Sequence, residues 1–127
     1  DDSLVRGTTC HKIVKMLYAA GAKEIHVRIA CPEILFPDFY GVDMPTKKEL
    51  LANGKTNQEI CDYINAKSLK FLSLAGLYKA LGFKERNKLY PQVSDHYFTG
   101  EYPVKPTDLL GEGKITQLSL LSGKSIN

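Results

Sequence analysis

The apolar residues near the start of the chain recur every three or four positions, which is the spacing of an amphipathic helix. We predict that this helix runs from Thr8 to Ala20. Its apolar side is expected to carry Ile13, Val14, Met16, Leu17 and Ala20. Thr8 or Thr9 is expected to cap its start, and Gly21 to follow its end in the left-handed conformation.

Two later segments have the pattern of strands. Residues 24–30 (EIHVRIA) alternate apolar and polar side chains, which predicts a strand with one wetter face. Residues 68–74 (SLKFLSL) predict a second strand. Loop, helix and strand follow one another as in half of a parallel βαβ unit, so the pattern predicts an α/β fold with a parallel sheet.

Two capping boxes, each a threonine followed three residues later by a glutamate, predict two more helix starts. The expected helices run from Thr46 through Asn53, from Thr56 to about Ile64 and, without such a box, from Ala75 to Leu81 before Gly82. Residues 31–46 are too long for a simple connection and are expected to form an ordered functional loop. Periodicity is lost beyond Phe83. We therefore divide the chain into one domain, residues 1–82, and a helical or irregular C-terminal tail, residues 83–127, that wraps the domain or meets a partner.

The composition narrows the class of protein. With 127 residues, 43% of them hydrophobic and 24% charged, the chain has the size and composition of one soluble globular domain. The net charge of +3 is small and scattered, which gives no support for nucleic acid or a membrane as partner. No apolar run approaches the roughly 18 residues of a membrane helix. Three widely spaced cysteines indicate free thiols in a reducing compartment, so we expect a cytoplasmic protein.

The first nine residues, DDSLVRGTT, carry the candidate chemistry. Gly7 lets the backbone turn closely around a ligand, Thr8 and Thr9 bring hydroxyl donors, and the helix that follows aims free N–H groups at the loop. Together they suit a phosphate monoester. Asp1 and Asp2 suit the vicinal hydroxyls of a sugar and can hold Mg²⁺, so the whole segment suits ribose 5-phosphate. An alternative stays open, in which Asp1 to Ser3 form a solvated turn ahead of an ordinary helix.

A loop of this kind leaves the carboxyl end of a strand in α/β proteins. We therefore expect a strand upstream of Asp1 in a longer protein, in preference to one supplied by another chain.

The same nine residues resemble the second half of the phosphoribosylpyrophosphate (PRPP) motif of type I phosphoribosyltransferases, and the form SLVRGTT is most similar to the glutamine PRPP amidotransferases. Four further segments resemble that branch in the same order: residues 20–32 (AGAKEIHVRIACP), 36–46 (FPDFYGVDMPT), 68–77 (SLKFLSLAGL) and 98–103 (FTGEYP). The resemblance implies the second half of a Rossmann-like phosphoribosyltransferase domain.

The resemblance also implies roles. Asp1 and Asp2 would hold the ribose hydroxyls and the Mg²⁺-bound substrate, and Ser3, Leu4, Val5, Arg6, Gly7, Thr8 and Thr9 would cradle the 5-phosphate. Arg6 would either reach the phosphates or only steer them. Tyr40 and Asp43 would lie near a nucleotide or inhibitor site, although an equal alternative is that Phe39 and Tyr40 only pack the loop onto the sheet.

One departure from the family concerns the iron–sulfur cluster that some members carry. The places of three cluster cysteines hold Asp38 and the run Val93 to His96. Since such a cluster is held by thiolates, we predict that there is none.

The family's reaction forms 5-phosphoribosylamine and pyrophosphate from PRPP and ammonia, at the start of purine synthesis. The expected partners are PRPP, purine nucleotide inhibitors, a glutaminase domain in the rest of the parent enzyme, and further copies in a homo-oligomer. No glutaminase cysteine is present, so we expect no catalytic residue in these 127 residues and no activity from them alone. Two other interpretations stay open, namely a ribose-phosphate or purine-nucleotide binding module without turnover and a structural half-domain completed by a partner chain.

Overall fold

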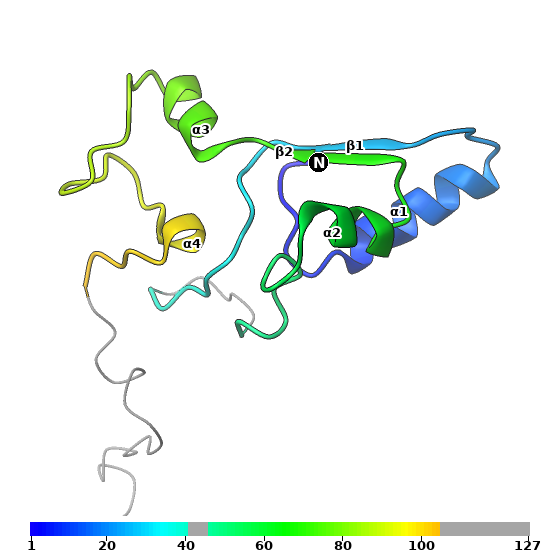
Figure 1. The fold of residues 1–127 in the computed structure, drawn as a ribbon, viewed down its shortest axis with the longest axis horizontal. Helices are drawn as coiled ribbons and strands as arrows, with labels where there is room; N and C mark the ends of the chain where they lie inside the picture. Colours follow the sequence, from blue (N-terminus) through cyan, green and yellow to red (C-terminus); the bar gives the residue numbers. More distant parts are fainter. Residues whose placement is uncertain (41–45, 105–127) are drawn as a thin grey trace, which may run out of the picture.

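The computed structural model describes residues 1–40 and 46–104 (Figure 1). The elements are, in order, α1 (Thr8–Ala19), β1 (His26–Ile29), α2 (Asn57–Tyr63), β2 (Ser68–Phe71), α3 (Leu74–Ala80) and α4 (His96–Thr99). The strands β1 and β2 pair in parallel, with His26 opposite Ser68 and Ile29 opposite Phe71. The predicted α/β fold with a parallel sheet is confirmed, and both strands are shorter than the sequence pattern suggested.

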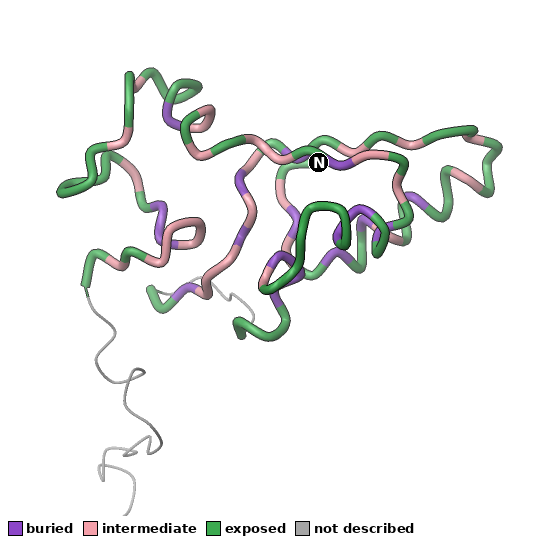
Figure 2. The backbone as a smooth tube through the Cα atoms, viewed as in Figure 1, coloured by how far each residue is buried: buried purple, intermediate pink, exposed green. Residues whose placement is uncertain are grey.

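The main core lies between the sheet and the two helices α1 and α2, which are on the same side of it (Figure 1). Alternate strand residues face these helices, among them the buried Ile29 and Leu69, whereas His26 and Arg28 point to the exposed face. The core is made of Leu4, Cys10, Val14, Ile29, Leu51, Ala52, Ile60, Cys61, Ile64 and Leu69. Helix, strand and opening loop therefore share one packed interior (Figure 2).

The helix α1 agrees with its predicted range but not with its predicted buried face. Cys10 and Val14 are buried in it, whereas Ile13, Met16 and Leu17 are 46%, 70% and 45% exposed. Apolar residues cover more than one side of this helix, and their spacing alone does not tell which side meets the core. At the end of the helix Gly21, at φ +97°, donates to the Tyr18 carbonyl at 3.0 Å, so the predicted glycine ending is confirmed.

The two capping boxes have different outcomes. Thr56 and Glu59 form the complete reciprocal box, and α2 follows it as predicted. Thr46 and Glu49 make only half of the box: Glu49 Oε2 accepts from the Thr46 N–H and hydroxyl, but the Glu49 N–H donates to the Thr46 backbone carbonyl. Turns follow them, and the predicted helix through Asn53 is wrong. The three consecutive residues 50–52 are all buried there. Three neighbours cannot share one side of a helix, because each residue is turned by about 100° from the last, so core burial overrides the cap.

Residues beyond Phe83 pack against the loop that follows β1. The backbone N–H groups of Leu35 and Phe36 donate to the Tyr97 carbonyl at 2.9 and 3.0 Å. The helix α3 has the predicted ending, with Gly82 at φ +87°. None of the helices in the described part of the chain is long and apolar enough to cross a membrane.

Candidate functional site

The acidic pair lies beside the carboxyl end of β1. The Asp1 amino nitrogen donates to the Arg28 carbonyl at 3.0 Å, and the Ala30 N–H donates to the Asp1 carbonyl at 2.9 Å. These two bonds flank Ile29 in the way that a neighbouring parallel strand does. Asp1 thus occupies the third-strand position, on the edge of β1 opposite β2, and its side chain stands where ligands of α/β sheets bind.

The two carboxylates are exposed and organise the start of the loop. Asp1 Oδ1 accepts from the Asp2 N–H at 3.0 Å, and Asp2 Oδ1 accepts from the Ser3 N–H at 2.6 Å and from its hydroxyl at 3.3 Å. In each carboxylate these bonds engage one oxygen. The other oxygen makes no hydrogen bond within the described residues, which leaves it available to a hydroxyl or a cation.

Gly7, rather than a threonine, is the N-cap of α1. Its φ is +73°, and no side chain caps the helix, so the predicted threonine cap is wrong. Thr8 and Thr9 are instead the first two helical residues, and both are exposed. The first N–H groups of a helix have no partner inside it. These N–H donors therefore point toward the loop, with the positive end of the helix dipole behind them, and Thr8 and Thr9 add two hydroxyls at the same end of the helix.

The loop and the helix start enclose a hollow of about 230 Å³, lined by Asp1, Ser3, Leu4, Val5, Arg6, Gly7, Thr8, Thr9 and Cys10. The structure thus brings together all but one of the nine predicted loop residues, Asp2 being the one outside the lining. Leu4 lines the hollow and is also buried in the main core, so its side chain anchors the loop. Burial raises the pKa of the Cys10 thiol, which keeps it protonated and a poor nucleophile.

A second segment supports the loop from outside. The Leu51 N–H donates to the Val5 carbonyl at 2.8 Å. Gly7 lies so close to Leu51 and Tyr63 that a Cβ atom there would overlap the Leu51 side chain and approach Tyr63 to 3.1 Å. Sequence reasoning missed Leu51 and Tyr63, because nothing local marks residues that contact the loop from more than 40 positions away.

This chain is similar in sequence to proteins of one kind. It is 53% identical over 123 residues to an amidophosphoribosyltransferase of Rhizobium etli, covering 96% of this chain and 25% of the relative. It is 52% identical over 108 residues to the chloroplastic amidophosphoribosyltransferase 2 of Arabidopsis thaliana, covering 85% of this chain and 18% of the relative. No protein-family model matches the chain.

The fold agrees with these sequences. A solved structure of the glutamine PRPP amidotransferase of B. subtilis, complexed with ADP and GMP, superposes with a TM-score of 0.72 and 47% identity over 81% of this chain and 22% of that one. The chain is homologous to a segment of the amidophosphoribosyltransferases. It spans about a quarter of the length of the Rhizobium relative.

The positions that hold cluster cysteines in some amidophosphoribosyltransferases contain a buried polar pair here. His96 Nε2 lies 2.7 Å from Asp38 Oδ1, and the two side chains are 1% and 0% exposed. Tyr40 packs edge-on against the His96 ring at 5.2 Å. The prediction that this chain carries no cluster stays a prediction. The pair shows that the loop after β1 and the start of α4 are joined directly by side chains.

The second predicted region of the site is only partly described. Asp43 lies outside the described residues. The Tyr40 hydroxyl donates to the Val104 carbonyl at 2.6 Å and accepts from the Val104 N–H at 3.1 Å. Phe39 packs on Tyr102 at 5.2 Å between ring centres. Phe39 and Tyr40 thus both contact the segment after α4, and the contacts described for them are not with the sheet.

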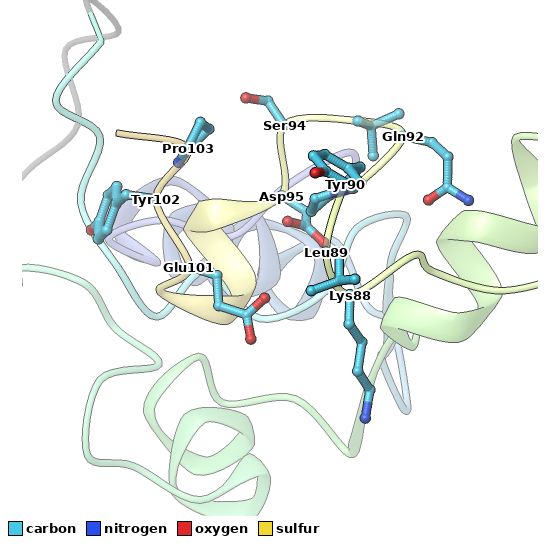
Figure 3. Close-up of a pocket in the computed structure, with 11 residues that line it drawn as sticks. Lys88, Leu89, Tyr90, Gln92, Ser94, Asp95, Glu101, Tyr102 and Pro103 are labelled. Atoms are coloured by element: carbon cyan, nitrogen blue, oxygen red, sulfur yellow. The ribbon is translucent and has the colours of Figure 1, made fainter. Parts of the chain in front are cut away.

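A larger hollow of about 560 Å³ lies along residues 88–95 and 101–103, away from the loop (Figure 3). It contains none of the predicted site residues. Figure 3 shows the Lys88 side chain extending away from Tyr102 and Pro103. Leu89 and Tyr90 are 83% and 80% exposed, so this hollow is an open surface, and the smaller one at Gly7 is the better candidate for a polar ligand.

Proposed function

We propose that this chain supplies the part of an amidophosphoribosyltransferase that binds the ribose 5-phosphate moiety of PRPP. The observation that carries the proposal is the placement of Asp1, at the third-strand position beside β1, next to the hollow at Gly7 and the N-terminus of α1. The 5-phosphate needs hydrogen-bond donors, and the ribose hydroxyls need acceptors. The loop has acceptors at its start, in the acidic pair, and donors at its end, at the N-terminus of α1. The names of the relatives favour the same substrate.

In the proposed reaction, ammonia displaces pyrophosphate from C1 of the ribose, and the enzyme forms 5-phosphoribosylamine for purine synthesis. Positive charge develops on the ribose ring as the bond to pyrophosphate breaks, so positioning and charge stabilisation are the main contributions of the protein. The backbone N–H groups and hydroxyls of Thr8 and Thr9 hold the 5-phosphate. Asp1 and Asp2 accept hydrogen bonds from the ribose hydroxyls and so fix the ring.

The acidic pair fits Mg²⁺ in the way this ion is commonly bound, by one or two carboxylates together with substrate phosphates. Each carboxylate has an oxygen left over, as described above. The described residues contain no group of three His, Cys, Asp or Glu side chains that would hold a metal unaided. Mg²⁺ held by Asp1 and Asp2 together with PRPP would supply positive charge to offset the charge of the pyrophosphate leaving group.

The remaining parts of the reaction are proposed to lie outside these 127 residues. Ammonia comes from a glutaminase domain in the rest of the parent enzyme. The chain alone is therefore expected to be inactive. We further propose a cytoplasmic homo-oligomer, and purine nucleotides as inhibitors, in line with the ADP and GMP of the B. subtilis structure.

A calorimetric titration of the 127-residue chain with PRPP, with and without Mg²⁺, tests the site. We expect Mg²⁺-dependent binding that is lost in Asp1→Asn/Asp2→Asn. The matched control is Asp62→Asn, an exposed carboxylate of α2 that bonds only to Gln58 among the described residues. Binding that is indifferent to the acidic pair, or tighter for purine monophosphates than for PRPP, would contradict the proposal and favour a nucleotide-binding module.

A further inference from the structure

Arg6, which lines the hollow at Gly7, forms an ion pair with Glu49, a residue that does not line it. Arg6 Nε lies 3.6 Å from Glu49 Oε1, and the two side chains are 54% and 50% exposed. The contact between the two side chains is at the Nε edge of the guanidinium. Its two terminal nitrogens make no hydrogen bond within the described residues, and Arg6 lines the hollow at Gly7.

Glu49 is fixed by its neighbours before it meets Arg6. Its Oε2 accepts from the Thr46 N–H at 3.0 Å and from the Thr46 hydroxyl at 2.9 Å. These bonds, and secondarily Arg6, lower the pKa of the Glu49 carboxyl, so it is ionised at neutral pH. One oxygen is thus fastened to Thr46 and the other presented to Arg6. The Leu51 N–H, two residues on, donates to the Val5 carbonyl, so the segment that carries Glu49 is bonded directly to the loop.

We propose that Glu49 is a positioning residue that holds Arg6 by its Nε edge, so that the two terminal nitrogens face the phosphate hollow. This inference rests on the proposed function. A guanidinium has a planar fork that matches two phosphate oxygens, but only when it is correctly oriented. An exposed ion pair adds little stability, so what Glu49 contributes is the orientation of Arg6 and not the strength of the fold.

The direction in which one substitution changes phosphate affinity separates this positioning role from a purely electrostatic effect. Glu49→Gln removes a negative charge next to an anion site, which by Coulomb's law alone strengthens phosphate binding. If Glu49 orients Arg6, the same change weakens binding, because the guanidinium loses its anchor. We expect a weakening of about fivefold in the dissociation constant, the scale of one lost charge-assisted hydrogen bond that is partly exposed.

Glu59→Gln is a matched control, because Glu59 makes the same two bonds to Thr56 and contacts no residue of the loop. The experiment titrates the 127-residue chain with ribose 5-phosphate, followed by nuclear magnetic resonance, for wild type, Glu49→Gln, Glu59→Gln, Arg6→Gln and the double variant Arg6→Gln/Glu49→Gln. Glu49→Gln should bind about fivefold more weakly, and Glu59→Gln as wild type does. In the Arg6→Gln background, loss of Glu49 should no longer weaken binding.

A signal of Arg6 itself tests the contact without ligand. The Nε–H resonance of Arg6 should shift in Glu49→Gln and stay in place in Glu59→Gln. If wild type binds ribose 5-phosphate and Glu49→Gln binds equally well or more tightly, the positioning role is wrong and the proposed function stands. If the folded wild-type chain does not bind ribose 5-phosphate, the proposed function fails, and the role of Glu49 fails with it.

Discussion

Asp38 and His96 are separated by 58 positions in the chain, yet their side chains meet at 2.7 Å in the interior. Asp38 also accepts from the Tyr40 N–H at 3.1 Å, so it orders the loop as well as holding the histidine. His96 Nδ1 has no hydrogen-bond partner within the described residues. The histidine thus depends on Asp38 for the bond that its buried ring makes.

Replacing Asp38 by Asn should therefore destabilise the fold. Asparagine has one side-chain oxygen in place of the two that contact His96 and the Tyr40 N–H, so one of these contacts is lost, at a cost of about 2 kcal/mol in the free energy of unfolding. Urea denaturation of Asp38→Asn and of the exposed control Asp62→Asn measures this, and the control should change by less than about 0.5 kcal/mol. Equal stabilities of the two variants would mean that the pair contributes nothing.

Gly7→Ala should disturb the loop for two separable reasons. Gly7 has φ +73°, which costs an alanine about 1–2 kcal/mol, and a Cβ would also overlap Leu51. Gly54→Ala is the matched control, because its φ is +72° and nothing lies within 4 Å of the added carbon.

Thermal denaturation should show Gly7→Ala to be the less stable of the two, and Gly7→Ala should cost less in a Leu51→Ala background than in wild type, because the overlap is then removed. Equal losses in the two glycine variants would show that Leu51 yields without cost.

The parts of the fold that sequence predicted are those whose partners lie within one turn or one strand. The box of Thr56 and Glu59 spans four residues, and the alternation around Val27 needs only the strand itself. The nine loop residues could likewise be grouped because they are consecutive, and eight of them line one hollow.

What sequence missed depends on distant partners. The face of α1 that carries Met16 is as apolar as the face that carries Val14, and only the position of the sheet decides between them. Glu49 has the local signal of a helix cap, but burial of residues 50–52 directs the chain into turns. Asp38 and His96 leave no periodicity at all, since their contact is made by the tertiary fold.

Asp95 should make stability depend on acid pH. Burial raises the pKa of this carboxyl, but hydrogen bonds from Arg86 and Tyr78 outweigh burial and hold the pKa below its usual value. A group with a lowered folded-state pKa stabilises the fold above its unfolded pKa of about 4, and that contribution is lost as pH falls through the folded value.

Asp95→Asn should therefore be less stable by about 3 kcal/mol at pH 7, because Arg86 and Tyr78 lose a buried partner. The difference from wild type should shrink as pH falls below the unfolded pKa of about 4, because the lowered folded-state pKa places the loss of this contribution there. Denaturant unfolding of both proteins across this pH range measures the difference. The pKa values of Glu49 and Glu59 are also lowered, but both residues are present in wild type and variant, so their contributions cancel. A difference that is constant with pH would show that Asp95 acts only by its shape.

The two threonine–glutamate boxes should differ in their effect on stability although both glutamates accept the same two bonds from their threonine. Thr56 caps a real helix and accepts from the Glu59 N–H at 3.2 Å, so Thr56→Ala should cost about 1 kcal/mol. Thr46 precedes turns, and no helix dipole or row of free N–H groups depends on it. Thr46→Ala should therefore cost less, about 0.5 kcal/mol, in urea denaturation. Equal losses would mean that each box acts through its own side-chain bonds and that the helix behind Thr56 adds nothing.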